Sequence, residues 1–139
     1  MITKQVHAHL PSKWGKFDIV AYAASADEAQ PHLALIHQPI DFDSAVPVRI
    51  HSECLTGDLF GSKRCDCGEQ FDLSLKMISQ HGGILIYLRQ EGRGIGLINK
   101  LKDFNLQDKG LDTIEANVHL GFEPDERDFE LAIDILRDL

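Results

Sequence analysis

The chain has 139 residues, of which 43% are hydrophobic and 26% charged, a composition that suits one globular domain. Its formal net charge of −8 is the opposite of the basic balance of nonspecific nucleic-acid binders, so we expect no nucleic-acid partner. No apolar run reaches the length of a bilayer span, and residues 1–10 lack the apolar core of a secretory signal. We therefore expect no membrane partner and a cytoplasmic location.

Four short segments in the first third of the chain predict β-strands. Residues 3–10 and 16–23 flank a turn and predict a hairpin, and residues 33–37 and 46–51 are short β-type runs. We expect these segments to form a small, mostly antiparallel sheet.

Helical periodicity appears after the last cysteine. Phe71, Leu75 and Ile78 share one helical face, and the continuous apolar run of residues 84–88 is typical of a strand buried on both faces. A helix is expected from Leu97 through Phe104, and residues 113–118 predict a short strand. The last helix is marked by the apolar stripe Phe129, Ala132, Ile133, Leu136 and Leu139.

These elements predict a single domain, residues 1–139, of the α/β (α+β) class. Its mostly antiparallel N-terminal strands are followed by helices interleaved with buried strands around one mixed sheet.

The three cysteines, Cys54, Cys65 and Cys67, fall in one short window that is rich in glycine. Thiolates are soft ligands that suit zinc, and an odd number of clustered cysteines argues against a disulfide framework. Three protein ligands leave a fourth position for a water, whose pKa zinc lowers toward neutrality. Two alternatives stay open: the cysteines are small buried hydrophobic residues, or His51 completes a closed structural site.

A glycine-rich segment, residues 89–96, follows the buried strand and precedes a helix. Backbone N–H groups at such a helix N-terminus bind anions, and the guanidinium of Arg93 can bind phosphate oxygens in a forked arrangement. Glycines are also common at such turns for steric reasons, so the local pattern leaves phosphate binding open.

Acidic residues surround Arg127 just before the last helix. Capping and the helix dipole explain Asp128 well, but they explain a loop arginine such as Arg127 less well. A carboxylate here could serve as general base for a zinc-bound water.

Six segments, in order, resemble the signatures of the GTP cyclohydrolase II family. The likeness runs from about Trp14 to the end of the chain. The segments are His51-Ser-Glu-Cys54-Leu-Thr-Gly-Asp58, Arg64-Cys-Asp-Cys-Gly68, Arg89-Gln-Glu-Gly-Arg93, Gly96-Leu-Ile-Asn-Lys100, Leu106-Gln-Asp108 and Asp125-Glu-Arg-Asp-Phe129.

The resemblance implies a zinc-dependent hydrolase that opens the imidazole ring of GTP in the first step of riboflavin biosynthesis. The reaction releases formate and pyrophosphate and leaves 2,5-diamino-6-ribosylamino-4(3H)-pyrimidinone 5′-phosphate. The family also implies a homodimer, one Zn²⁺ per chain, and Mg²⁺ that accompanies the triphosphate.

The resemblance assigns roles to individual residues. Asp125 matches the proton acceptor and Arg127 the residue assigned as nucleophile. Because a guanidinium is almost always protonated, charge stabilisation at the phosphate is an alternative role for Arg127. The implied zinc ligands are Cys54, Cys65 and Cys67, and the implied GTP contacts are Arg49, Ile50, His51, Ser52, Glu53, Gln70, Glu91, Gly92, Arg93 and Thr113.

Two features depart from the family pattern. Phe104 stands where most members carry a tyrosine, and the missing hydroxyl makes a reaction that stops at the formylamino intermediate one alternative. The family's following strand and loop, which supply a threonine and a lysine to GTP, are missing, so we expect a C-terminally incomplete domain. Two further hypotheses are an inactive zinc-stabilised remnant that serves in binding or dimerisation, and a cyclohydrolase for another purine nucleotide.

Overall fold

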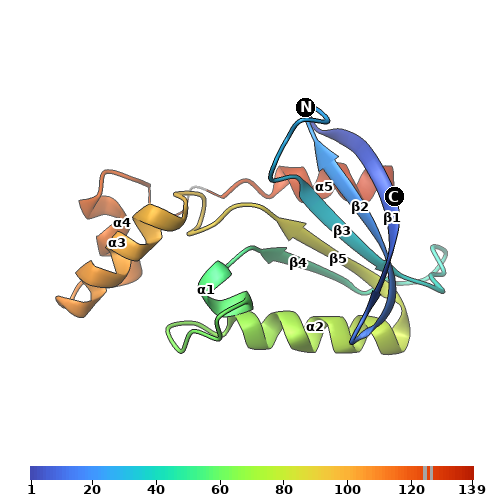
Figure 1. Cartoon of the computed structure of the whole chain (residues 1–139), viewed down its shortest axis with the longest axis horizontal. Coiled ribbons are helices and arrows are strands. Elements are labelled where there is room, and N and C mark those ends of the chain that lie inside the picture. The colour runs from blue at the N-terminus through green and yellow to red at the C-terminus, as the bar shows by residue number, and fades with distance from the viewer. Residues whose placement is uncertain (124, 126) are drawn as a thin grey trace.

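The computed structural model describes residues 1–123, 125 and 127–139, which form one mixed sheet with helices on both faces (Figure 1). The strands are β1 (Thr3–Ser12), β2 (Gly15–Ala23), β3 (His32–His37), β4 (Val48–Ser52) and β5 (Gly83–Leu88). The helices are α1 (Leu55–Asp58), α2 (Cys67–His81), α3 (Leu97–Asp108), α4 (Thr113–His119) and α5 (Glu130–Asp138). The α+β class and the mixed sheet expected from the sequence are thereby confirmed.

The strands lie in the order β1-β2-β3-β5-β4. All neighbouring strands are antiparallel except β4 and β5, which are parallel. Parallel neighbours need a crossover connection, and α1 and α2 supply it. The carboxyl ends of β4 and β5 therefore meet at one edge of the sheet, on the side where α3 and α4 lie (Figure 1).

Helix α5 covers one face of the sheet. Its buried residues, Ala132 and Ile135, pack against a cluster that includes Val20 and Ile86. Tyr22 on the same face donates a hydrogen bond to Asp138 at 2.7 Å, which attaches the end of α5 to β2.

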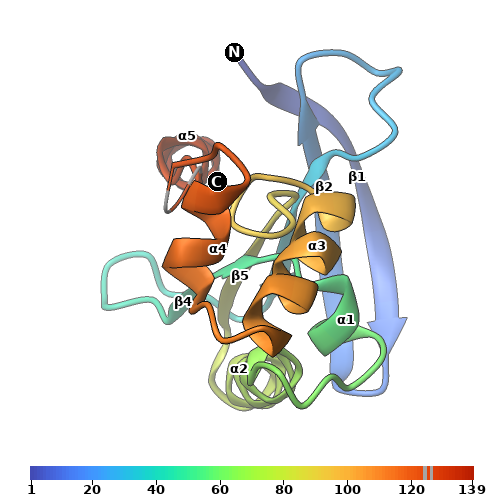
Figure 2. The ribbon, with the colours of Figure 1, turned by 90° about the vertical axis from the view of Figure 1, so that its left-hand side faces the viewer.

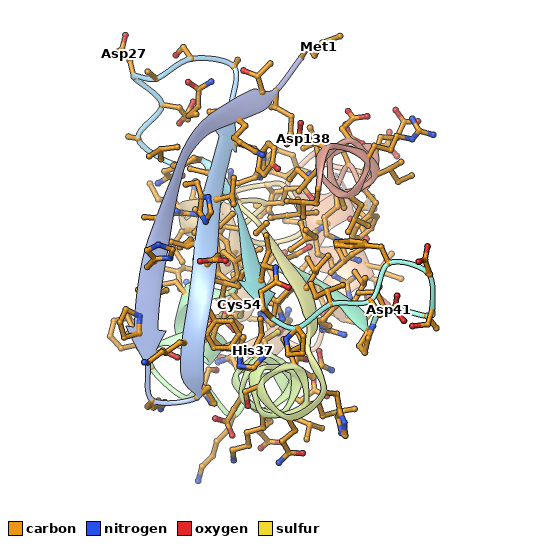
Figure 3. All side chains as sticks on the ribbon, turned by 90° about the vertical axis from the view of Figure 1, so that its right-hand side faces the viewer. Met1, Asp27, His37, Asp41, Cys54 and Asp138 are labelled. Carbon is orange, nitrogen blue, oxygen red and sulfur yellow. The ribbon has the colours of Figure 1, made fainter. Side chains whose placement is uncertain are left out.

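Helix α2 covers the other face. Leu75 and Ile78 pack on Phe17, Leu35 and Leu85, as the helical spacing of the apolar residues predicted. Because side chains alternate along β5, this strand contributes to both cores, and the expected burial on both faces is confirmed. Long loops that include Asp27 and Asp41 project on opposite sides of the molecule (Figure 3).

One prediction about local structure was wrong. Residues 113–118 form α4 rather than a strand, because the Asp112 side chain accepts a hydrogen bond from Glu115 N at 2.7 Å and caps the helix. Of the stripe predicted for α5, Ala132, Leu136 and Leu139 pack on the core, whereas Ile133 is 47% exposed. Among the described residues, no helix is long and apolar enough to cross a bilayer.

The central position of Ile86 gives a test of the fold. This side chain is fully buried in β5, so Ile86→Ala should lower the free energy of unfolding by about 2–5 kcal/mol through lost burial and a residual cavity. The measurement is urea denaturation followed by circular dichroism. The exposed Ile98 offers a control, and Ile98→Ala should change stability by less than about 0.5 kcal/mol. Equal effects of the two substitutions would contradict the assigned core.

Candidate functional site

A pocket of about 320 Å³ opens beyond the carboxyl ends of β4 and β5. Figure 2 looks at this end of the molecule, where α3 and α4 stand in front of the two strand ends. Crevices at the carboxyl ends of parallel strands are common ligand sites in α/β proteins. The pocket is lined by Ser52, Glu53, Cys54, Arg64, Cys65, Asp66, Cys67, Gln90, Gly92, Arg93, Lys100, Asp103, Phe104, Gln107, Thr113, Asn117 and Arg127.

The three cysteines converge on one wall of this pocket. Cys54 follows β4 and precedes α1, Cys67 begins α2, and Cys65 lies in the loop between these helices. Their sulfur atoms all lie within 4.8 Å of one another, and the Sγ atoms of Cys54 and Cys65 are 3.7 Å apart. Three thiols at such distances form a donor set that a soft divalent metal can occupy after small adjustments.

Two glycines allow the cysteines to approach each other. A Cβ atom at Gly57 would lie 2.8 Å from Cys65 Sγ, and a Cβ atom at Gly68 would collide with the carbonyl oxygen of Gly57. Only glycine therefore permits α1 and the start of α2 to approach this closely. The residues present fit a metal, because both the donor atoms and the space beside them are provided.

His51 does not belong to this group of donor atoms. Its ring is buried, stacks on Tyr87, and donates from Nε2 to Asp58 at 3.0 Å. The metal-ligand cluster found at this site among the described residues consists of the three cysteines alone. This arrangement favours an open site with three protein ligands over a closed site that includes His51.

Asp58 connects the cysteine loop to the sheet. Its carboxylate accepts hydrogen bonds from His51 Nε2, from Cys54 N at 3.0 Å and from the Tyr87 hydroxyl at 2.8 Å. Burial opposes ionisation of Asp58, but the hydrogen bonds from His51, Cys54 and Tyr87 outweigh it and hold the pKa of this carboxyl below its ordinary value. Asp58 thus stays ionised and fixes Cys54 relative to β4 and β5.

Lys100 and Glu91 form a second buried connection to the cysteines. Lys100 Nζ donates to Glu91 Oε1 at 2.6 Å and to Cys54 Sγ at 3.0 Å, while Glu91 Oε2 accepts from Leu55 N at 2.8 Å. Burial alone would raise the pKa of the Cys54 thiol, but the contact with Lys100 lowers it overall. Burial raises the pKa of Cys67. The cluster therefore contains one cysteine whose thiolate is favoured before any metal binds.

The glycine-rich turn has an unusual backbone. Gly92 and Arg93 adopt φ angles of 63° and 60°, in the left-handed region that non-glycine residues rarely occupy. This conformation leaves Arg93 exposed at the pocket. Strain of this kind is characteristic of ligand-binding turns.

Arg127 reaches the pocket from the segment before α5. Its guanidinium donates from Nε to Asp125 Oδ1 at 2.9 Å, and this pair keeps the pKa of Asp125 below its ordinary value. Gln90 Nε2 donates to the carbonyl oxygen of Asp128 at 2.8 Å and so joins this segment to the end of β5. Within the acidic segment that the sequence singled out, Pro124 and Glu126 lie outside the described residues.

The residues proposed to bind GTP do not all line the pocket. Those that line it are Ser52, Glu53, Gly92, Arg93 and Thr113, together with Arg127. Arg49 instead donates a hydrogen bond from Nη2 to Gln70 Oε1 at 2.8 Å. Glu91 does not line the pocket but pairs with Lys100, which does. Asp125 is connected to the pocket through its contact with Arg127.

Sequence reasoning assigned no role to several lining residues, notably Asp103, Gln107 and Asn117 on α3 and α4. Lys100, Asp103, Phe104 and Gln107 follow the i, i+3, i+4, i+7 spacing of one helical face. A search for polar residues at this spacing would have found Asp103 and Gln107.

Comparisons with known proteins agree with this geometry. A model of the family described as GTP cyclohydrolase II matches residues 3–139. The chain is 53% identical over 137 residues to GTP cyclohydrolase-2 of Campylobacter fetus, covering 99% of this chain and 69% of the relative. It is 53% identical over 138 residues to GTP cyclohydrolase-2 of Picrophilus torridus, covering 99% and 71%.

A longer relative is the riboflavin biosynthesis protein RibBA of Bacillus cytotoxicus. The identity is 52% over 139 residues, covering 99% of this chain but 35% of the relative. The chain therefore spans about a third of this relative and about two thirds of the two GTP cyclohydrolase-2 proteins.

Removing the carboxylate that connects the cysteine loop to the sheet should destabilise the protein in a pH-dependent way. Asp58→Ala leaves three buried donors without an acceptor, and we expect a loss of about 3–5 kcal/mol in the free energy of unfolding at pH 7. Because the folded-state pKa of Asp58 is lowered, its contribution is present above about pH 4 and disappears as the pH falls through the folded value.

Chemical denaturation of wild type and variant between pH 3 and pH 7 checks this expectation. The difference in unfolding free energy should shrink in the most acidic samples. Asp27→Ala, in an exposed loop, is the control and should leave stability nearly unchanged at every pH. A difference that stays constant down to pH 3 would argue against the proposed ionised Asp58.

Proposed function

Because the chain belongs to the GTP cyclohydrolase II family, we propose that it hydrolyses the imidazole ring of GTP in its pocket, as the first step of riboflavin biosynthesis. The products would be formate, pyrophosphate and 2,5-diamino-6-ribosylamino-4(3H)-pyrimidinone 5′-phosphate. The observation that carries this proposal is the convergence of three thiols on the wall of a pocket that also contains Arg93 and Arg127.

One Zn²⁺ per chain would be held by Cys54, Cys65 and Cys67. When bound, zinc supplies Lewis acidity and lowers the pKa of a water at its open position. The close approach of Gly57 and Gly68 supports this assignment, because it has no other evident use than to bring the cysteines together. Lys100 and Glu91 would keep Cys54 in place beside the substrate.

Arg93 and Arg127 are the groups we assign to the triphosphate. In a chain with a net charge of −8, they place positive charge at the pocket, where phosphate oxygens can accept forked hydrogen bonds. We propose that Mg²⁺ accompanies the triphosphate and compensates the remaining negative charge.

We assign proton transfer to Asp125 and charge stabilisation to Arg127. Arg127 donates from both Nε and Nη2 to Asp125, and a guanidinium held in this way is a poor nucleophile. The same contact lowers the pKa of Asp125 and makes it a weak base. If Arg127 moved to a phosphate on substrate binding, the pKa of Asp125 would rise and proton acceptance would become easier.

The second candidate function is a reaction that stops after ring opening. Phe104 lines the pocket, and its ring lies 4.6 Å from the guanidinium carbon of Arg64 and 5.9 Å from Lys100 Nζ. The hydroxyl of a tyrosine, which the resemblance gives most family members at this position, would therefore lie at the pocket among hydrogen-bonding groups. Its absence favours release of the formylamino intermediate over release of formate.

For the assembled state we propose a homodimeric, cytoplasmic enzyme.

Zinc binding should depend on the glycine contact between the helices. Gly68→Ala places a methyl group against the Gly57 carbonyl oxygen and must separate α1 from α2, so zinc affinity should fall by at least about tenfold. Metal content by mass spectrometry and competition with a chromogenic chelator measure this change. Met77→Ala, on the exposed side of α2, should bind zinc like wild type. Undiminished zinc affinity in Gly68→Ala would contradict the assigned donor set.

Product analysis tests the activity and the role of Phe104 together. Zinc-loaded protein is incubated with GTP and Mg²⁺, formate and pyrophosphate are quantified, and the pyrimidine product is identified by mass. The complete reaction releases formate and pyrophosphate in equal amounts, whereas a reaction that stops after ring opening releases pyrophosphate in excess of formate. In the second case Phe104→Tyr should bring the ratio of formate to pyrophosphate close to one, because it restores a hydroxyl donor at the pocket.

The same assay distinguishes the alternatives. Equal formate and pyrophosphate from wild type would mean a complete cyclohydrolase in which Phe104 is tolerated. No turnover by zinc-bound protein, together with equal GTP affinity of wild type and Arg93→Ala, would instead support a zinc-stabilised binding module.

A further inference from the structure

Helix α3 buries a charged residue and exposes apolar ones. Asp103 is 4% exposed and is the one buried residue of α3, every residue of which the structure describes. On the same helix Ile98 is 73% exposed and Leu101 is 44% exposed. Helices ordinarily bury their apolar face, and burying a carboxylate without a partner is costly. The burial of Asp103 therefore lowers the free energy of unfolding of the protein.

Asp103 has no compensating partner within the described chain. Its Oδ1 atom is buried without a hydrogen bond, and no ion pair to this carboxylate is formed among the described residues. The neighbouring cations of the pocket are otherwise engaged, Arg64 by Asp108 and Lys100 by Glu91. Burial raises the pKa of Asp103 with no opposing charge. An unsatisfied carboxylate in a pocket indicates that a ligand supplies the missing donors.

The position of Asp103 relative to the cysteines limits which part of a nucleotide it can contact. Lys100, one helical turn earlier on the same face, donates to Cys54 Sγ at 3.0 Å. Asp103 lies about 5 Å further along the helix axis and lines the same pocket. We therefore place the five-membered ring of a purine at the cysteines and its six-membered ring toward Asp103, within the pocket that both line.

We propose that Asp103 recognises guanine by accepting hydrogen bonds from its N1–H and 2-amino groups. This inference rests on the proposed function, and it names the residue that selects the base. Guanine presents two adjacent donors on this edge, which match the two oxygens of a carboxylate that can only accept. Adenine presents an acceptor at N1, hypoxanthine lacks the amino group, and xanthine presents a carbonyl oxygen that would repel the carboxylate.

Binding of base analogues tests this assignment. The probes are the α,β-methylene triphosphates of guanosine, inosine and xanthosine, which resist release of pyrophosphate, and affinities are measured by titration calorimetry with zinc-loaded protein. Wild type should bind the guanosine probe about 10- to 100-fold more tightly than the inosine probe, and the xanthosine probe most weakly. Asp103→Asn and Asp103→Ala should each remove most of this preference. Asp27→Asn, a change of the same kind in an exposed loop, should retain it.

Thermal unfolding separates a change in recognition from a change in folding. Asp103→Asn removes a buried, unpaired charge, so its melting temperature should equal or exceed that of wild type while discrimination between guanosine and inosine is lost. If both variants kept the wild-type preference, the assignment of Asp103 would be overturned while the proposed function would stand. If zinc-loaded wild type bound no guanosine probe, both the proposed function and this inference would fail.

Discussion

The buried carboxylate of Asp58 is the constraint on which the functional end of the molecule depends. A charge inside a protein is tolerated only when donors surround it, and here the donors come from β4, from β5 and from the backbone at the start of α1. The hydrogen bonds to this one carboxylate therefore fix the positions of the ends of the parallel strands and of Cys54 relative to one another. The glycine contact between α1 and α2 then determines where the other two cysteines can lie.

Much of the fold follows from patterns that are local in the sequence. The turn between β1 and β2, the continuous apolar run of β5 and the helical spacing of α2 are each visible in a short stretch of sequence. The prediction failed for α4, where Asp112 supplies a helix cap that outweighs the β-branched content of residues 113–118. The burial of Ile135 in α5 could not be read from the sequence, because apolar residues lie on more than one side of that helix and only tertiary packing selects among them.

The parts of the candidate site that could be predicted are those whose residues lie close together in the sequence. The cysteine cluster was found because its ligands and the glycines between them lie in one window. The contact of Lys100 with Cys54, by contrast, joins residues far apart in sequence, and no pattern in either segment predicts it. Asp103 escaped notice because periodicity arguments follow apolar residues, and here a helix buries a carboxylate. Such local departures from the rule are most informative at functional sites.

The cysteines lie close together in sequence, whereas Arg127 is far from them, and this affects the order in which the molecule assembles. The three sulfur atoms come from one short segment whose closure costs little entropy. The segment that carries Arg127 is joined to the pocket by the hydrogen bond from Gln90 to the carbonyl oxygen of Asp128. During synthesis, the segment with the three cysteines leaves the ribosome well before the segment that carries Arg127. A metal bound by the three cysteines would therefore first stabilise the partly synthesised chain. The substrate site would be complete only after the later helices had packed.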